Sequence, residues 1–227
     1  MRRPSSYGFR SPTARWSRHP NIPAEDGLPS LLAASDVLGT GWFGAVAADV
    51  RPGKTVAVVG DGAVGLLAML AAERLGAERI IVMSRREDRQ KLALEFGDEI
   101  VEERRDDGVA KIKELTNGLG AEAVVEAVGT PESMMQAIRA TRPGGHVGYV
   151  GVPHGVELSA VELFFSHVHL HGGPAPVRRF LPELIELICN RTIDPGKVFD
   201  LELPLEQAAD GYEAMDQRRA IKVLLTV

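Results

Sequence analysis

Residues 55–67 read TVAVVGDGAVGLL, and this stretch decides the fold. An apolar run leads into G-x-G-x-x-G, and apolar residues at helical spacing follow. In such a strand–turn–helix the first glycine permits the tight turn, the second lets the backbone approach a pyrophosphate, and the third lets helix and strand pack closely. The N-terminus of the helix adds free N–H groups and a positive dipole end. The stretch predicts a dinucleotide site, and the alternative is a glycine-rich turn without a ligand. The predicted cofactor contacts here are Gly60, Gly62, Ala63, Val64 and Gly65.

Strand and helix signals alternate along the chain. A helical stretch from Ser35 to Val50, which Asp36 could cap, comes before the motif. Short apolar strands separated by helices are typical of a parallel sheet covered on both faces, and right-handed crossovers make such a sheet doubly wound. The strands are predicted at Thr55–Val59, Arg79–Met83, Glu99–Val101, Ala123–Ala127 and His146–Val150, and the helices between them begin near Gly62, Glu87, Gly108 and Pro131.

The pattern changes after Gly151. A helical turn at 163–165 and a sixth strand at 168–170 are followed by an amphipathic helix at 180–190 and by a strand, helix and strand at 198–203, 205–215 and 221–227. We therefore expect an α/β fold, a doubly wound parallel (Rossmann) sheet with a C-terminal α/β extension.

Composition excludes several classes of protein. The 227 residues are 44% hydrophobic and 25% charged with a net charge of −5, which is ordinary for a soluble globular chain and argues against a nucleic-acid or membrane-surface role. No apolar run approaches the length of a membrane span. The single cysteine, Cys189, excludes an intrachain disulfide and is expected in a helix core. We expect a cytoplasmic protein with no nucleic-acid or membrane partner.

The residues after the second strand indicate which dinucleotide is bound. An NAD site needs an acid there for the ribose 2′-hydroxyl, but this chain has Ser84, Arg85 and Arg86. A hydroxyl and a guanidinium suit a 2′-phosphate, which a carboxylate would repel. The pattern favours NADP(H), and the alternative is a solvated arginine pair. The missing acid also weakens the main rival for this architecture, an S-adenosylmethionine methyltransferase.

Four segments in order resemble the zinc-dependent alcohol dehydrogenases of the medium-chain dehydrogenase/reductase superfamily. They are 35–45 (SDVLGTGWFGA), 56–65 (VAVVGDGAVG), 142–148 (RPGGHVG) and 220–225 (AIKVLL). The resemblance runs from about Asn21 to Val227, and the Ser84–Arg85 pair is similar to the NADP-dependent secondary-alcohol branch.

The resemblance implies roles for individual residues. Asp36 matches a catalytic zinc ligand, although a plain helix cap is the alternative, and Thr40 matches a catalytic residue beside the nicotinamide. Trp42 is the one candidate wall of a substrate pocket. The further cofactor contacts that the resemblance implies are Val128, Gly129, Gly151 and Val152 along the cofactor, Gly172 in a turn near the nicotinamide, and Lys222 at the pyrophosphate.

The chain also departs from the family. The resemblance implies an N-terminal domain that supplies the other zinc ligands, and we expect these 227 residues to lack it. Asp36 alone cannot hold zinc, which needs three protein ligands and an open position. We expect a remnant of that catalytic domain at 21–39, a dinucleotide-binding domain at 40–173, and at 174–227 a segment that packs on the catalytic domain in the family, so that its apolar face could lack a partner here.

Residues 1–20 carry five arginines and no acid. A disordered basic tail is expected there, with a transit peptide as an alternative. A third hypothesis is a frame-shifted tail, because residues 7–20, back-translated with GC-rich codons and read one base earlier, can give VRVPLADGTLVATP, which looks like the family sequence.

His167, His169 and His171 alternate on the predicted sixth strand, so their side chains are expected to share one face. Edge or interface histidines are the favoured interpretation, and a metal site is the alternative. The family pairs its subunits through this region, which implies a homo-oligomer, most simply a dimer.

The leading functional hypothesis is an NADP(H)-dependent oxidoreductase acting on a small alcohol or carbonyl substrate, with this chain as mainly the cofactor-binding half. The alternative is a non-catalytic NADP(H)-binding domain or an inactive remnant.

Overall fold

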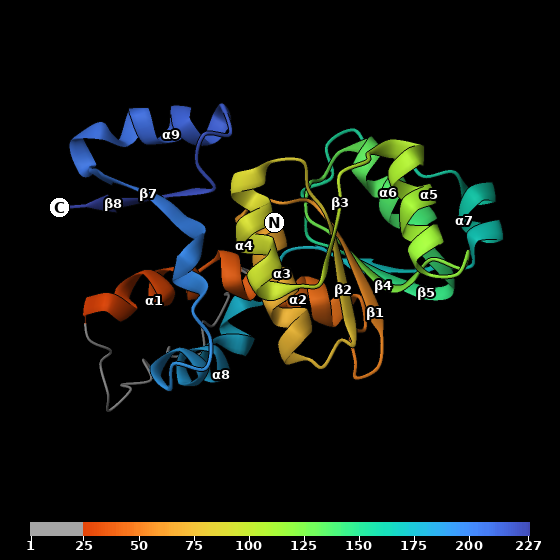
Figure 1. Cartoon of the computed structure of the whole chain (residues 1–227), viewed down its shortest axis with the longest axis horizontal. Coiled ribbons are helices and arrows are strands. Elements are labelled where there is room, and N and C mark those ends of the chain that lie inside the picture. The colour runs from red at the N-terminus through yellow and green to blue at the C-terminus, as the bar shows by residue number, and fades with distance from the viewer. Residues whose placement is uncertain (1–24) are drawn as a thin grey trace, which may run out of the picture.

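The computed structural model describes residues 25–227. Six parallel strands form one sheet in the order β3-β2-β1-β4-β5-β6, with helices on both faces (Figure 1). The strand order reverses between β1 and β4, which makes the topological switch point where doubly wound sheets bind their ligands. The predicted Rossmann-type α/β fold is confirmed. The strands are β1 (Thr55–Val59), β2 (Arg79–Met83), β3 (Glu99–Val101), β4 (Ala121–Glu126), β5 (Thr141–Tyr149) and β6 (His169–Gly172).

The two faces of the sheet build two separate cores, because successive strand residues point in opposite directions. Val56 and Val58 pack with the helices on one face of the sheet, which we call the first group. Ala57 and Val59 pack with the helices on the other face, the second group. The helices of the first group are α1 (Leu28–Ala34), α2 (Val37–Ala47), α3 (Ala63–Arg74), α4 (Glu87–Phe96) and α8 (Val177–Cys189). Those of the second group are α5 (Arg105–Leu115), α6 (Pro131–Ala140) and α7 (Ala160–Ser166). Short 3₁₀ turns occupy η1 (Glu25–Gly27), η2 (Pro195–Val198) and η3 (Leu205–Gln207).

Several predicted boundaries are wrong by three residues or more, among them the starts of the helices predicted at 180 and 205, which begin at Val177 and Ala208. Two others have a clear physical reason. The fourth helix begins at Arg105 rather than near Gly108, since Asp106 and Asp107 suit the positive end of its first turn. The fifth strand begins at Thr141 rather than His146. Its Pro143-Gly144-Gly145 segment lies in an irregularity of β5, because the register with β4 changes from Ala121 opposite Thr141 to Ala123 opposite His146. A strand tolerates proline and glycine at such a bulge.

The helix predicted after Ser35 is confirmed as α2, and Asp36 occupies its N-cap position. The Asp36 side chain makes no capping hydrogen bond, so the cap that the sequence suggested is absent from this helix.

The predicted common face of three histidines is wrong. His167 ends α7 in a left-handed conformation with φ of 51°, before β6 begins. Only His169 and His171 lie on the strand, at alternate positions. His169 stacks on His146 of β5 with ring centroids 4.4 Å apart, and His171 meets the ring of Phe43 in α2.

The C-terminal segment has two parts. Helix α8 buries its apolar face, through Phe180, Leu184 and Ile188, in the first core, so this face is covered within the chain. Strands β7 (Phe199–Pro204) and β8 (Lys222–Thr226) form a separate parallel pair, and α9 (Ala208–Asp216) lies beside it (Figure 1). No residue of these two strands is fully buried. We refer to β7, α9 and β8 as the C-terminal unit.

Residues 1–20, where the tail and frame-shift hypotheses fall, lie outside the described residues, as does part of the predicted 21–39 segment. Between residues 25 and 227 no single helix is long and apolar enough to cross a membrane; α1 and α2 reach the required length only together, and they are bent by 50°.

Packing of α8 into the first core predicts an asymmetry between two leucines. Leu184 is 0% exposed, so Leu184→Ala should lower the free energy of unfolding by about 2–5 kcal/mol. Leu94 is 55% exposed, and Leu94→Ala should change it by less than about 0.5 kcal/mol. Urea denaturation followed by circular dichroism measures both, and equal small losses would contradict the packing of α8.

Candidate functional site

The glycine loop joins β1 to α3 by a close approach of its own backbone. A Cβ on Gly65 would overlap the carbonyl oxygen of Gly60, so this position admits only glycine. Gly60 has φ of 119°, a conformation that side chains rarely adopt. Gly62 differs, because a Cβ there would meet no protein atom within 4 Å. The protein does not need a glycine at position 62, whereas a ligand that approaches the backbone would.

Helix α3 begins directly after this loop, and no side chain caps it. Its N-cap residue, Gly62, has φ of −80° and ψ of 178°. The N–H groups of the first turn have no carbonyl acceptor within the helix, and they form the positive end of its dipole. The arrangement suits an anion such as a pyrophosphate.

A second loop, after β4, is held in place by a buried glutamate. Glu126 is 0% exposed, and its Oε1 accepts hydrogen bonds from the N–H of Val128 (2.9 Å), the N–H of Gly129 (2.7 Å) and the Ser133 hydroxyl (2.7 Å). Gly129 lies against the backbone of Gly151, where neither position leaves space for a Cβ. These contacts bring the two predicted cofactor segments, 128–129 and 151–152, side by side.

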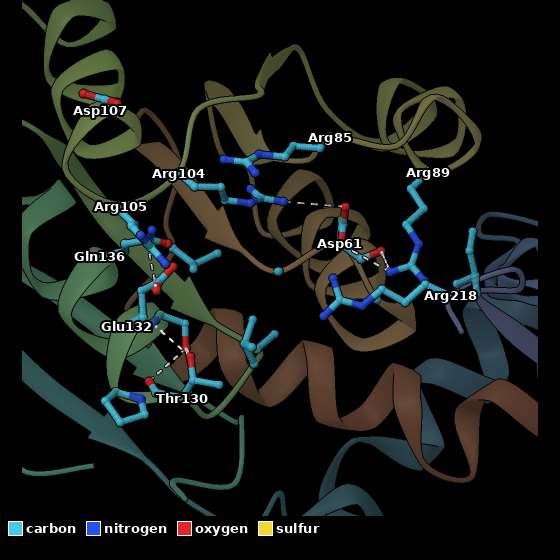
Figure 2. Close-up of a pocket in the computed structure, with 18 of the residues that line it drawn as sticks. Asp61, Arg85, Arg89, Arg104, Arg105, Asp107, Thr130, Glu132, Gln136 and Arg218 are labelled. Carbon is cyan, nitrogen blue, oxygen red and sulfur yellow. Dashed lines mark hydrogen bonds and ion pairs between the residues drawn. The ribbon is translucent and has the colours of Figure 1, made fainter. Parts of the chain in front are cut away.

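A cavity of about 1390 Å³ opens at the carboxyl ends of β1 to β4, at the switch point (Figure 2). Typical ligand pockets measure roughly 300–1,000 Å³, so there is room for a dinucleotide. Of the predicted cofactor residues, the wall of the cavity includes Gly60, Gly62, Arg85 and Val128.

Asp61, inside the glycine motif, is the centre of a buried polar network. Its carboxylate accepts a hydrogen bond from the Ser84 hydroxyl at 2.8 Å and forms an ion pair with Arg89 at 3.2 Å. Ser84 is 0% exposed and Arg89 only 7% exposed. Arg89 also donates to the carbonyl of Ala220, just before β8, at 3.4 Å. The hydroxyl of Ser84 therefore points at Asp61.

Further guanidinium groups gather around Asp61. Arg104, just after β3, lies 3.8 Å from the Asp61 carboxylate, and Arg218, just after α9, lines the same cavity. Burial lowers the pKa of Arg104, Asp61 raises it, and the positive charges of Arg85 and Arg218 lower it further. This end of the cavity therefore carries repelling cations, an arrangement suited to an anionic ligand.

The remaining predicted residues lie outside the cavity wall. Arg86 pairs with Asp88 at 3.4 Å, and Lys222 opens β8. Thr40 lies within α2, half-buried. The predicted residues that are not part of the wall are Thr40, Ala63, Val64, Gly65, Ser84, Arg86, Gly129, Gly151, Val152, Gly172 and Lys222.

The described residues do not fit a zinc ion. Asp36 is exposed, and no group of three or more His, Cys, Asp or Glu side chains in residues 25–227 is arranged to hold a metal. Zinc needs three protein ligands and an open position. Trp42 is 3% exposed in the first core, so it is not available as the wall of a substrate pocket.

Comparison with known proteins gives the family. The sequence model of the zinc-binding dehydrogenase family matches residues 63–189, more than half of the chain. The chain belongs to this family. A probable zinc-binding alcohol dehydrogenase of Mycobacterium tuberculosis is 38% identical over 84% of the chain and 50% of the relative. An NADP-dependent isopropanol dehydrogenase of Entamoeba histolytica is 33% identical over 88% of the chain and 57% of the relative.

Solved structures agree with this assignment. The alcohol dehydrogenase TADH of Thermus sp. ATN1 superposes with a TM-score of 0.84 at 31% identity, covering 92% of this chain and 60% of that one. This member of the zinc-binding dehydrogenase family thus spans about half the length of the curated relatives it matches.

Four residues of this site were not among the predicted ones. Asp61 lies within the motif itself, and Arg104 follows the third predicted strand by three residues. The carboxyl ends of parallel strands meet at one edge of a sheet, so the sequence could have placed both residues at the site. No sequence pattern could have placed Arg89 and Arg218 at the site, because their positions depend on how α4 and the C-terminal unit pack.

Two glycines of this family member should respond oppositely to alanine. Gly65→Ala should lower the free energy of unfolding by about 1–3 kcal/mol or more, because its methyl group overlaps Gly60. Gly62→Ala should leave it unchanged or raise it by less than about 1 kcal/mol, because the site is open and the unfolded chain loses freedom. Thermal and urea unfolding measure both, and a destabilised Gly62→Ala would contradict the open space at that position.

The Asp61 network makes a further prediction. Arg89→Met should lower the free energy of unfolding by about 3–5 kcal/mol, because it leaves a buried carboxylate short of its closest cation. The matched variant Arg86→Met, at a largely exposed pair, should cost less than about 1 kcal/mol. Equal losses in urea denaturation would show that Arg104 and Ser84 satisfy Asp61 without Arg89.

Proposed function

We propose that this chain binds NADP(H) and is the cofactor-binding part of an oxidoreductase that interconverts an alcohol with an aldehyde or ketone. The observation that carries the proposal is the cavity at the switch point, where an uncapped helix N-terminus and an open glycine position adjoin a group of arginines. The names of the relatives, which include an NADP-dependent isopropanol dehydrogenase, support the reaction class.

Each part of the cofactor has a proposed position. The pyrophosphate lies against Gly62 and the first turn of α3, where the N–H groups point outward. The 2′-phosphate lies beyond β2, near Arg85. The nicotinamide extends toward Val128, where the loop that Glu126 holds forms the wall. Lys222 and Thr40 are kept as proposed contacts on the resemblance alone.

NADP(H), held against Gly62, Arg85 and Val128, would supply the hydride chemistry of the proposed reaction while the protein orients it. That reaction is the oxidation of an alcohol carbon to a carbonyl, with the hydroxyl proton released to solvent, or its reverse. No step of the proposal passes through zinc, because the described residues offer one candidate ligand, Asp36.

The alternative is a non-catalytic NADP(H)-binding chain. Substrate oxidation separates the two functions, whereas cofactor binding is common to both. We also propose a homo-oligomer, most simply a dimer, through β6, which ends the sheet and exposes His169 and His171.

Fluorescence titration with NADPH tests the proposal. The wild-type chain should bind NADPH saturably, and Gly62→Ala should bind it about 10-fold more weakly or worse, because the added methyl group occupies the pyrophosphate position. Leu94→Ala, which changes an exposed side chain on α4, is the control and should bind like the wild type.

Absence of NADPH binding by the folded wild-type chain would overturn both functions. Binding together with NADP-dependent oxidation of isopropanol supports the oxidoreductase, and binding without turnover of any alcohol supports the non-catalytic alternative.

A further inference from the structure

The cavity end beside Asp61 brings together guanidinium groups from three distant segments. Arg85 follows β2, Arg104 follows β3, and Arg218 follows α9 in the C-terminal unit. Figure 2 shows Arg104 and Arg89 reaching Asp61 from two sides, with the guanidinium of Arg85 beside that of Arg104. Arg85 donates to the carbonyl of Glu102 at 2.9 Å. One carboxylate therefore pairs with two of the four arginines that line this end of the cavity.

The other acidic groups of the cavity wall include two that are paired with arginines of their own. Glu132 pairs with Arg105 at 3.0 Å, and Asp106 pairs with Arg139 at 3.2 Å. Figure 2 shows Arg105 and Glu132 across the cavity from Asp61. Asp107, which is exposed, is labelled on the same side as Arg105. Burial lowers the pKa of Arg104, and Asp61 and, more weakly, Glu132 raise it.

Arg104 and Arg218 have donors to spare. The Arg104 guanidinium is three-quarters buried, and within residues 25–227 its one ion pair is the 3.8 Å contact with Asp61, which is too long for a hydrogen bond. The side chain of Arg218 forms no ion pair or hydrogen bond with any described residue. Burial lowers the pKa of Arg104, and repulsion from Arg85 and Arg218 lowers it further, so a bound anion would offset the cost of placing these cations together.

The C-terminal unit, to which Arg218 belongs, is attached to the sheet by few polar contacts. Ala220 accepts a hydrogen bond from Arg89 of α4 at 3.4 Å, and Lys197, which precedes β7, pairs with Glu95 of α4. Apolar contacts with the first core come from Phe199 of β7 and from Ile221, which are both only partly buried, and no residue of β7 or β8 is fully buried.

We propose that Arg104 and Arg218, together with Arg85, bind the 2′-phosphate of NADP(H), and that this phosphate ties the C-terminal unit to the Rossmann sheet. The inference rests on the proposed function for the identity of the ligand. It adds two phosphate contacts outside the Ser84–Arg86 segment and a structural role for the cofactor. A phosphate monoester carries a charge of about −1.5 to −2 and three acceptor oxygens, which match guanidinium donors arriving from separate directions.

We call this link between the C-terminal unit and the sheet, made by the 2′-phosphate and the three arginines, the clamp. Calorimetric titration of the full chain with NADPH and with NADH tests it. Arg104→Gln and Arg218→Gln should each weaken NADPH binding about 10-fold or more and change NADH binding less than about 2-fold, since NADH lacks the phosphate. Arg219→Gln is the matched control, because it removes the same charge from the same loop while Arg219 donates to Gln217 outside the cavity. It should leave both affinities unchanged.

Amide hydrogen exchange of residues 208–226 provides a second readout. NADPH should slow exchange in α9 and β8 of the wild-type chain, NADH should not, and Arg218→Gln should abolish the difference. If Arg104→Gln does not fold by circular dichroism, Arg104→Lys retains the charge without the bidentate fork and should give an intermediate loss of NADPH affinity.

The outcomes separate the clamp from the proposed function. A wild-type preference for NADPH that survives both glutamine variants overturns the clamp and leaves the proposed function standing. Equal affinity of the wild type for NADH and NADPH overturns the clamp and the NADP(H) preference but not dinucleotide binding. A folded wild-type chain that binds neither overturns the proposed function and the clamp together.

Discussion

The Asp61 carboxylate connects distant segments of this protein at the carboxyl ends of the sheet strands. It lies in the glycine loop, accepts the hydroxyl of Ser84 after β2, and pairs with Arg89 of α4. Arg89 extends the connection to Ala220 before β8. A buried charge is tolerated only when it is paired and hydrogen-bonded, so these segments must keep their relative positions for the loop to remain as it is. The shape of the cavity therefore depends on keeping these segments in place around Asp61.

Backbone contact sets the second constraint. Gly65 lies against Gly60 and Gly129 lies against Gly151, and in both pairs a side chain would overlap main-chain atoms. These approaches bring the start of α3 and the loop after β4 to the same edge of the sheet. The buried Glu126 then orients the N–H groups of that second loop. The buried charges and the close backbone contacts thus act on the same edge of the sheet, and together they position the walls of the cavity.

Much of the sheet could be predicted because its strands are short apolar runs with clear ends. Strands β1, β2 and β3 have the predicted bounds. Strand β5 was predicted too short because Pro143, Gly144 and Gly145 signal a turn locally. In the structure they form an irregular segment between Thr141 and His146, the two residues that pair with β4 on either side of it. His167 was assigned to a strand because alternation of residue types says nothing about where the preceding helix ends.

By itself, the sequence determined the order of strands and helices, the glycine turn and the absence of an acid after β2, because these depend on neighbouring residues. The tertiary structure alone decided that Ser84 faces Asp61, that Arg86 lies outside the cavity while Arg104 and Arg218 lie in its wall, and that α8 is covered whereas β7 and β8 are not. The reason is physical: a local pattern specifies backbone conformation, but charge pairing and burial depend on which segments, far apart in the chain, pack against each other.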